Sequence, residues 1–214
     1  MMLKGHLPSS TLLHAALDRE RGLRKGRLLS DVRLQDHPFK ESGFLAVTDG
    51  GVNPEPGLKE KRGILENALW VYRCLGVERP KVAVVCATEK VSVRMRHTVE
   101  AEKLKEMWQR GEFEGCVVEG PLSLDLALIR ESVRIKGVES EVAGEADILL
   151  MPTIETGNCV GKALVYFLGA VPGQVVMGGK VPLLIPSRSD SPEVKLNSIA
   201  LASLLMRRCR GEWD

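Results

Sequence analysis

The chain has 214 residues, of which 30 are Lys or Arg and 28 are Asp or Glu, so its net charge is only +2. Hydrophobic residues make up 44% of it, which is typical of a globular protein with a substantial core. The nearly balanced charge excludes a general attraction to nucleic acid, and the basic segment 19–27 resembles a solvated helix end because it lacks interleaved aromatic residues. The longest apolar runs have the length of strands and we find no targeting signal. We therefore expect a cytoplasmic protein that binds neither membranes nor nucleic acid.

Cysteine and histidine spacing gives no sign of a metal site. The five cysteines never come within a C-x-x-C spacing, and the four histidines are scattered. We therefore expect no zinc site, no other metal site and no disulfide framework. Cys159 lies beside a candidate site loop, and we interpret it as a buried small apolar residue.

The first half of the chain alternates between helical and strand-like patterns. Helices are predicted over 9–19 and 58–75, and strands over 1–3, near Val32 and over 44–48. Gly76 follows the second helix directly, which is typical of a helix-terminating glycine.

The second half continues the alternation. The pattern predicts a strand over 82–87, a helix over 98–110, a strand over 115–118 and a helix over 123–135. A strand over 146–154, a turn at Thr156, Gly157 and Asn158, and a helix over 160–167 follow. Two strands then come in succession, the second over 181–185, before a helix from Ser191 to about residue 207. Such an alternation predicts an α/β fold with a largely parallel sheet covered by helices. We take the strands at 146–154 and 181–185 to be parallel, so the loops after them mark the edge where open α/β sheets bind ligands.

Several polar residues follow predicted strands or open predicted helices. They are Asp49, Glu89, Asp125, Asn158, Lys162, Ser187, Arg188 and Asp190. Taken singly, each is typical of a helix cap or a surface charge. Arg188 points most clearly to a ligand, because a guanidinium at the start of a helix can grip phosphate with two hydrogen bonds. The segment 157–163 is not a phosphate-binding P-loop, because it has three residues between its glycines and no Ser or Thr after Lys162.

Seven segments in order resemble the phosphate acetyl/butyryltransferase family, and most closely its phosphate butyryltransferase branch. They are KGHLPSSTLLHAAL, SGFLAVTDGGVNPEP, LKEKRGILENAL, PKVAVVCATEKVS, VEGPLSLDLAL, ADILLMPTIETGNCVGKALVYF and VPLLIPSRSDSPEVKLNSIALAS. The resemblance implies a reaction that exchanges an acetyl, butyryl or branched acyl group between coenzyme A and inorganic phosphate. It also implies two α/β domains around a cleft, as in phosphotransacetylases and isocitrate dehydrogenases, and a homodimer.

The resemblance also nominates site residues. Ser187 and Arg188 match the family's Ser-Arg pair at the reaction centre, and Asp190 is a possible base because the family's usual aspartate is absent. The expected substrate-binding residues are Ser9, Ser10, Asn158 and Lys162. His14 stands where the family usually has an arginine. Coenzyme A and phosphate are expected as substrates, and no tightly bound cofactor is expected.

One departure concerns length, because relatives are longer at the amino terminus. Residues 1–27 would then be a fragment of a mostly missing first domain, residues 28–190 the second domain, and residues 191–214 a helix returning to the first domain. The orphan fragments would need a partner subunit to cover their apolar faces. This leaves two other hypotheses open: a non-catalytic dimerisation or ligand-binding remnant of the family, and a hydroxy-acid dehydrogenase or other enzyme of the same fold.

Overall fold

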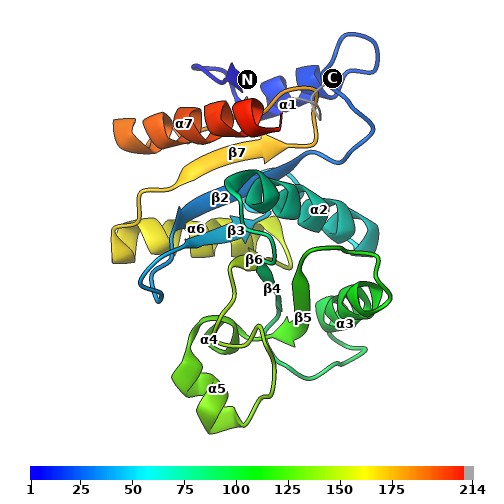
Figure 1. Cartoon of the computed structure of the whole chain (residues 1–214). Coiled ribbons are helices and arrows are strands. Elements are labelled where there is room, and N and C mark those ends of the chain that lie inside the picture. The colour runs from blue at the N-terminus through cyan, green and yellow to red at the C-terminus, as the bar shows by residue number, and fades with distance from the viewer. Residues whose placement is uncertain (210–214) are drawn as a thin grey trace.

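The structure is a computed structural model that describes residues 1–209, and these residues form one eight-stranded sheet (Figure 1). The strands are β1 (Met2–Leu3), β2 (Ser30–Asp36), β3 (Phe44–Thr48), β4 (Lys81–Val85), β5 (Val117–Leu122), β6 (Ile148–Leu150), β7 (Gly173–Met177) and β8 (Leu183–Leu184). Their order across the sheet is β1-β8-β7-β2-β3-β6-β4-β5. Both the first and the last strands of the chain lie at one end of this sheet, so segments distant in sequence build it together.

Four of the seven strand pairings are parallel, which confirms the predicted largely parallel α/β class. The exceptions involve β2, which is antiparallel to β3 and β7, and β8, which is antiparallel to β7. Strand β8 therefore runs opposite to β6, and the expectation that these two strands are parallel was wrong. The cause is the tight turn after β7, which returns the chain as a neighbouring antiparallel strand without a crossover helix.

Helices cover both faces of the sheet. They are α1 (Ser9–Ala16), α2 (Leu58–Leu75), α3 (Arg96–Gln109), α4 (Leu124–Leu128), α5 (Arg130–Lys136), α6 (Ile154–Leu168) and α7 (Pro192–Arg208). Helices α2, α3 and α7 share one hydrophobic cluster with Ala46 of β3, whereas α4 and α6 pack with its neighbours Leu45 and Val47. Since successive strand residues point to opposite faces, the first three helices cover one face and α4 and α6 the other. Helix α1 packs on Val176 of β7, on the same face as α6.

Several predicted elements are confirmed. Strand β3 and helix α2 have the predicted bounds, and Gly76 ends α2 in the left-handed conformation with φ of 86°. Ser191 caps α7, because its Oγ accepts a hydrogen bond from the backbone N–H of Val194 at 3.3 Å. Within residues 1–209, no helix is long and apolar enough to cross a membrane.

Three predicted elements were wrong in detail. The strand expected over 146–154 is paired only over β6, and Thr156, Gly157 and Asn158 belong to α6 rather than to a turn, because Thr153 caps that helix through the Thr156 N–H. The helix expected over 123–135 is divided at Ile129, whose extended backbone lets its side chain pack on the second cluster. Strand β5 also continues beyond the predicted 115–118, because it pairs with β4 as far as Leu122.

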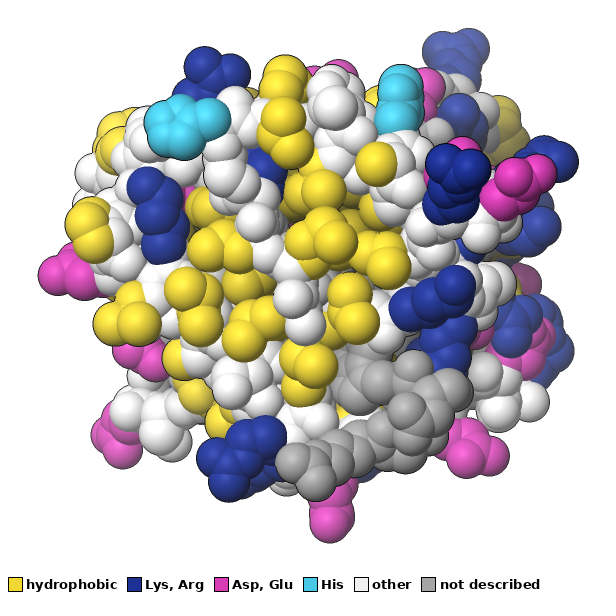
Figure 2. Space-filling view, turned by 90° about the horizontal axis from the view of Figure 1, so that it is seen from above, with side chains coloured by type: hydrophobic (Ala, Val, Ile, Leu, Met, Phe, Trp, Pro, Cys, Tyr) yellow, Lys and Arg dark blue, Asp and Glu magenta, His cyan; other side chains and the backbone are white. Residues whose placement is uncertain are grey.

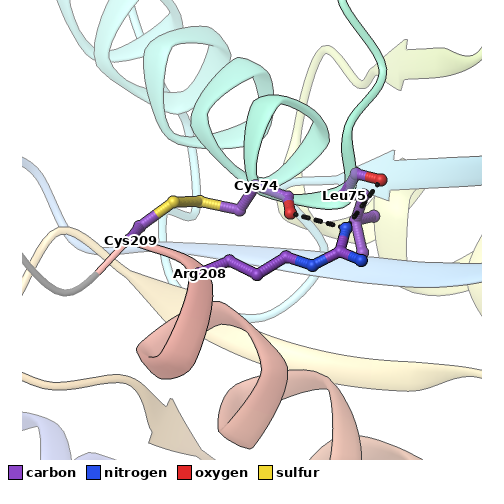
Figure 3. The surroundings of a disulfide bond; sticks show 4 residues. All are labelled: Cys74, Leu75, Arg208 and Cys209. Atoms are coloured by element: carbon purple, nitrogen blue, oxygen red, sulfur yellow. Dashed lines mark hydrogen bonds between the residues drawn. A yellow bond between two sulfur atoms is a disulfide. The ribbon is translucent and has the colours of Figure 1, made fainter.

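A disulfide joins Cys74, at the end of α2, to Cys209, directly after α7 (Figure 3). The expectation of no disulfide was therefore wrong, because a separation of 135 residues hides this contact from any spacing rule. The guanidinium of Arg208 lies beside the bond and donates to the carbonyl oxygens of Cys74 and Leu75, both at 3.3 Å. These contacts anchor the end of α7 on the end of α2.

The end of the sheet that carries β1 presents an apolar surface. Figure 2, which views the molecule from above, shows hydrophobic side chains gathered on this side. The exposed hydrophobic residues of β1, α7 and the segment before α1 are Met1, Met2, Leu3, Leu7 and Leu196. Among residues 1–209, strand β1 pairs only with β8 and forms the edge of the sheet.

Candidate functional site

A cleft of about 530 Å³ lies between α6, the segment before α1 and the loop that precedes α7. We call it the polar cleft. Its polar and charged lining residues are Lys4, Ser9, Arg33, Asn158, Lys162, Gln174, Ser187, Arg188, Ser189 and Asp190, and Gly50 and Gly51 complete one wall. The structure thus brings six predicted site residues to one cleft: Ser9, Asn158, Lys162, Ser187, Arg188 and Asp190. Ser10 is exposed on α1 and does not line it.

Helix α6 supplies one wall, and two glycines set its position. A Cβ at Gly157 would lie 2.3 Å from the backbone oxygen of Asp49, so only glycine lets this helix approach the loop after β3. The side chain of Asn158 then donates to the carbonyl oxygen of Gly50 at 3.1 Å. One turn later, Gly161 leaves room for the stem of Arg33, which a Cβ would meet at 3.1 Å. The helix therefore holds Asn158 and Lys162 at the cleft.

The loop with the Ser-Arg pair is organised by Asp190. Its carboxylate accepts a hydrogen bond from the backbone N–H of Ser187 at 2.7 Å. The hydroxyl groups of Ser187 and Ser189 lie 3.0 Å apart. Arg188 is exposed at the cleft, and no ion pair in residues 1–209 occupies its guanidinium. This loop therefore presents a hydroxyl, a guanidinium and a carboxylate within four consecutive residues.

The opposite wall comes from the amino-terminal segment. Strand β1 pairs with β8, which brings Lys4 beside the Ser-Arg loop. The Nζ atom of Lys4 donates to Oγ of Ser9 at 3.0 Å. Ser9 opens α1, which has no side-chain cap. A cation and a hydroxyl thus meet at the start of a helix, where the dipole favours an anion.

Arg33 and Gln174 line the cleft, and sequence reasoning missed both. They are opposite residues on the antiparallel strands β2 and β7, and the guanidinium of Arg33 donates to Oε1 of Gln174 at 3.1 Å. The prediction looked only at loops after parallel strands, whereas these residues lie inside strands. The available signal was the alternation in β2, where Asp31, Arg33 and Gln35 interleave with Val32 and Leu34.

A buried carboxyl group lies beneath this cleft. Asp31 is 1% exposed and sits behind Gly51, where an added Cβ would come within 3.1 Å of its Oδ2 atom. Its Oδ1 atom has no hydrogen-bond partner within residues 1–209. Burial, reinforced by the nearby carboxylates of Asp49 and Asp190, raises the pKa of Asp31 to about 7. Asp31 therefore adds little negative charge to the cleft below neutral pH.

The remaining acidic candidates do not line the polar cleft. The carboxylate of Asp49 accepts from the backbone N–H groups of Gly51, Val52 and Asn53, at 2.8, 3.0 and 3.1 Å, and so shapes the loop after β3. Burial raises the pKa of Asp49 despite these bonds. Asp125 pairs with Lys136 at 2.9 Å, away from the polar cleft. Glu89 lines a different hollow beside β5.

The polar cleft carries four cationic side chains, Lys4, Arg33, Lys162 and Arg188, against the single lining carboxylate of Asp190. Guanidinium groups and hydroxyls around a small space are suited to a phosphoryl group. Leu7, Val165 and Ile185 add an apolar portion to the same cleft. Fold and site together define an α/β protein with a cleft whose chemistry suits a phosphorylated ligand that carries a small apolar group.

Comparison with known proteins identifies the family within this class. The chain belongs to the phosphate acetyl/butaryl transferase family, whose model matches residues 1–203. It is 44% identical over 205 residues to the phosphate butyryltransferase of Clostridium acetobutylicum, covering 96% of this chain and 68% of the relative. It is 45% identical over 202 residues to a probable phosphate butyryltransferase of Bacillus subtilis, covering 94% and 67%. The crystal structure of a branched-chain phosphotransacylase from Enterococcus faecalis superposes with a TM-score of 0.85 at 35% identity, over 95% of this chain and 72% of that one.

These similarities confirm the predicted family and enzyme class, that of the phosphate acyltransferases. The family uses coenzyme A and phosphate as substrates. The chain spans about two thirds of the length of the butyryltransferases that it matches.

Proposed function

We propose that the polar cleft is the site where this chain transfers a short acyl group between coenzyme A and phosphate, with Arg188 holding the phosphoryl group. The observation that carries the proposal is the meeting of four cationic side chains and the Ser187 hydroxyl around one cleft in a member of this family. Lys4, Lys162 and Arg33 would share the phosphoryl charge, and Ser9 and Asn158 would donate hydrogen bonds to its oxygens.

In the direction that forms the thioester, the sulfur of coenzyme A attacks the carbonyl carbon of the acyl phosphate. The new bond joins sulfur to carbon, and the bond from that carbon to the bridging phosphate oxygen breaks. The thiol proton passes to the Asp190 carboxylate, which in turn can return it to the departing phosphate. The Ser187 hydroxyl donates to the acyl oxygen as negative charge develops on it, and Arg188 stabilises the phosphate that leaves.

The acyl group that fits this cleft is short, straight or branched. Leu7, Val165 and Ile185 form the apolar part of the lining, beside the residues proposed to hold phosphate. The names of the similar proteins, two butyryltransferases and a branched-chain phosphotransacylase, favour a group of about this size.

We also propose that the division of the chain follows the resemblance, with residues 1–27 and 191–214 completing a first domain and 28–190 forming the second. Residues 210–214 lie outside the part of the chain that the structure describes. The apolar surface around β1 and Leu196 would then pack against an α/β domain equivalent to the remaining third of the relatives. Strand β1 offers an open edge to which such a domain could add strands. A homodimer and a cytoplasmic location remain predictions from the sequence and the family resemblance.

The test is the turnover of butyryl phosphate with coenzyme A, measured as the rate at which the thioester forms. It is run on the chain itself and on the chain joined to the amino-terminal third of the C. acetobutylicum relative. We expect turnover in at least the fusion, and Arg188→Ala should lower kcat/KM by about 30- to 1,000-fold, as expected for losing a contact worth about 2–4 kcal/mol. Arg134→Ala, in an exposed pair with Glu131 on α5, is the matched control and should leave the rate unchanged.

Two results would count against the proposal. Absence of turnover in both proteins, with the fusion folded, would favour the alternative of a non-catalytic remnant. Full activity of the Arg188→Ala variant would remove the phosphate-holding role from this loop.

A further inference from the structure

A second hollow, of about 700 Å³, lies on the other side of the start of α6, and we call it the apolar pocket. Its nonpolar walls are formed by Val85, Ala87, Met95, Leu124, Met151, Pro152 and Val160. Arg94 and Arg96 are exposed at its rim, and Glu55, His97, Thr98, Thr156 and two thiols complete the lining. None of these residues lines the polar cleft, so the two hollows are separate.

The apolar pocket lies at a switch point of the sheet. Strands β4 and β6 are parallel neighbours, and the pocket is lined by the residues at and just beyond their carboxyl ends. Helix α3, after β4, covers one face of the sheet, whereas α6, after β6, covers the other. Chains that leave adjacent parallel strands toward opposite faces open a crevice between them, and open α/β sheets bind ligands in such crevices.

Buried charged residues position Arg96 at the rim of the apolar pocket. Nε of Arg96 lies 3.2 Å from Oε1 of Glu100. The other carboxylate oxygen, Oε2, accepts a hydrogen bond from Nζ of Lys61 at 2.6 Å. Lys61 is 1% exposed and its amine also contacts Nδ1 of His97 at 2.9 Å. Arg96 is therefore oriented by a buried charge network, and Arg94 forms no ion pair in the described part of the chain.

We propose that the apolar pocket holds the nucleotide half of coenzyme A, with the adenine ring between the apolar walls and the ribose phosphate on Arg94 and Arg96. This inference rests on the proposed function, because it assigns a place to the part of the thiol substrate that lies far from the reacting sulfur. Guanidinium groups both stack on flat aromatic rings and pair with phosphate, so two arginines over a nonpolar floor suit an adenine nucleotide. Glu55 at the rim can accept a hydrogen bond from the adenine amine.

The two hollows are close enough for one substrate to reach both. Gly50 and Gly51, after β3, line the polar cleft, and the ends of β4 and β6 line the apolar pocket. Strand β6 lies between β3 and β4, so these edges are about 10 Å apart at the usual strand spacing. Asn158 faces the first hollow and its neighbour Cys159 the second. The flexible pantetheine arm would cross the start of α6 and bring the thiol to Ser187 and Arg188.

The first test compares coenzyme A with pantetheine, which carries the same thiol and no nucleotide. In a protein that turns over, Arg94→Gln/Arg96→Gln should raise KM for coenzyme A by about tenfold or more, since hydrogen bonds between charged groups are lost. It should leave KM for pantetheine and for butyryl phosphate unchanged, and Arg134→Gln should alter none of the three. Equal effects on both thiols, or no effect on coenzyme A, would overturn the proposal.

The second test needs no turnover, so it separates failure of this proposal from failure of the proposed function. Cys159 is an exposed thiol in the pocket, whereas Cys86 and Cys116 are buried and burial raises the pKa of each to about 11. Adenosine 3′,5′-bisphosphate should slow alkylation of Cys159 by iodoacetamide, as read by mass spectrometry, and this protection should weaken about tenfold in Arg94→Gln/Arg96→Gln. Absence of protection at millimolar bisphosphate, protection that survives the double substitution, or protection by butyrate alone would each contradict it.

Discussion

The polar cleft and the apolar pocket share one helix but differ in chemistry and in their place in the sheet. The polar cleft lies over the antiparallel strands β2 and β7 and gathers four cationic side chains. The apolar pocket lies beyond the parallel strands β4 and β6 and has nonpolar walls with arginines only at its rim. The mixed sheet therefore offers two kinds of site on either side of α6, one suited to a small charged group and one to a larger, partly flat group.

Both hollows depend on the position of α6. We therefore expect the largest loss of stability from a substitution where that helix meets the loop after β3. Gly157→Ala places a Cβ 2.3 Å from the Asp49 backbone oxygen, which no side-chain rotation can relieve. We expect a loss of about 3 kcal/mol in the free energy of unfolding, measured in urea, because overpacking against backbone forces the helix to move. Binding at both hollows should weaken.

Gly5→Ala is the matched control, because a Cβ at that exposed position meets no atom within 4 Å. It should change stability by less than about 0.5 kcal/mol. A Gly157→Ala variant as stable as the control would show that α6 is not fixed by this contact.

A smaller effect on stability is expected from pH, because a titrating carboxyl group lies beneath the polar cleft and not beside the apolar pocket. Burial raises the pKa of Asp31 to about 7, so between the ordinary value of 3.8 and about 7 the folded protein keeps a proton that the unfolded chain releases. The folded state then binds more protons, and stability falls as pH rises through that window. Arg33, Gln174, Asp49 and Asp190 are the groups that act on this carboxyl.

Asp31→Asn removes that proton exchange. Relative to the wild type, we expect the variant to gain on the order of 2 kcal/mol between pH 4 and pH 8, measured as the difference in unfolding free energy at the two values. The accessibility of Cys159 in the apolar pocket should not change. Parallel stability curves for variant and wild type over this range would contradict a raised pKa at Asp31.

Local pattern was enough to predict much of this molecule. Helix α2 has an unbroken helical period and ends at Gly76, so its bounds could be predicted. The predicted loop residues Ser187, Arg188 and Asp190 do line one cleft, because the buried strand before the loop and the capped helix after it fix both of its ends.

What the sequence left hidden depends on contacts between distant segments. Arg33 and Gln174 meet only because β2 and β7 pair across 141 residues, and the Cys74–Cys209 bond depends on where α7 ends. Cys159 was expected to be buried, which was wrong, because α6 begins earlier than predicted and turns that side chain to an open hollow. Paired strand directions, which no local pattern specifies, decided where the cleft lies.

The most direct test of the central claim is the affinity of the polar cleft for inorganic phosphate. Isothermal titration calorimetry would compare the wild type with Arg188→Ala, and with Arg134→Ala as the control outside both hollows. We expect Arg188→Ala to weaken phosphate binding by about 10- to 100-fold, since a charged hydrogen-bonding partner is lost, and Arg134→Ala to bind as the wild type does. Equal phosphate affinity in the wild type and the Arg188→Ala variant would contradict the assignment of the phosphoryl group to this cleft.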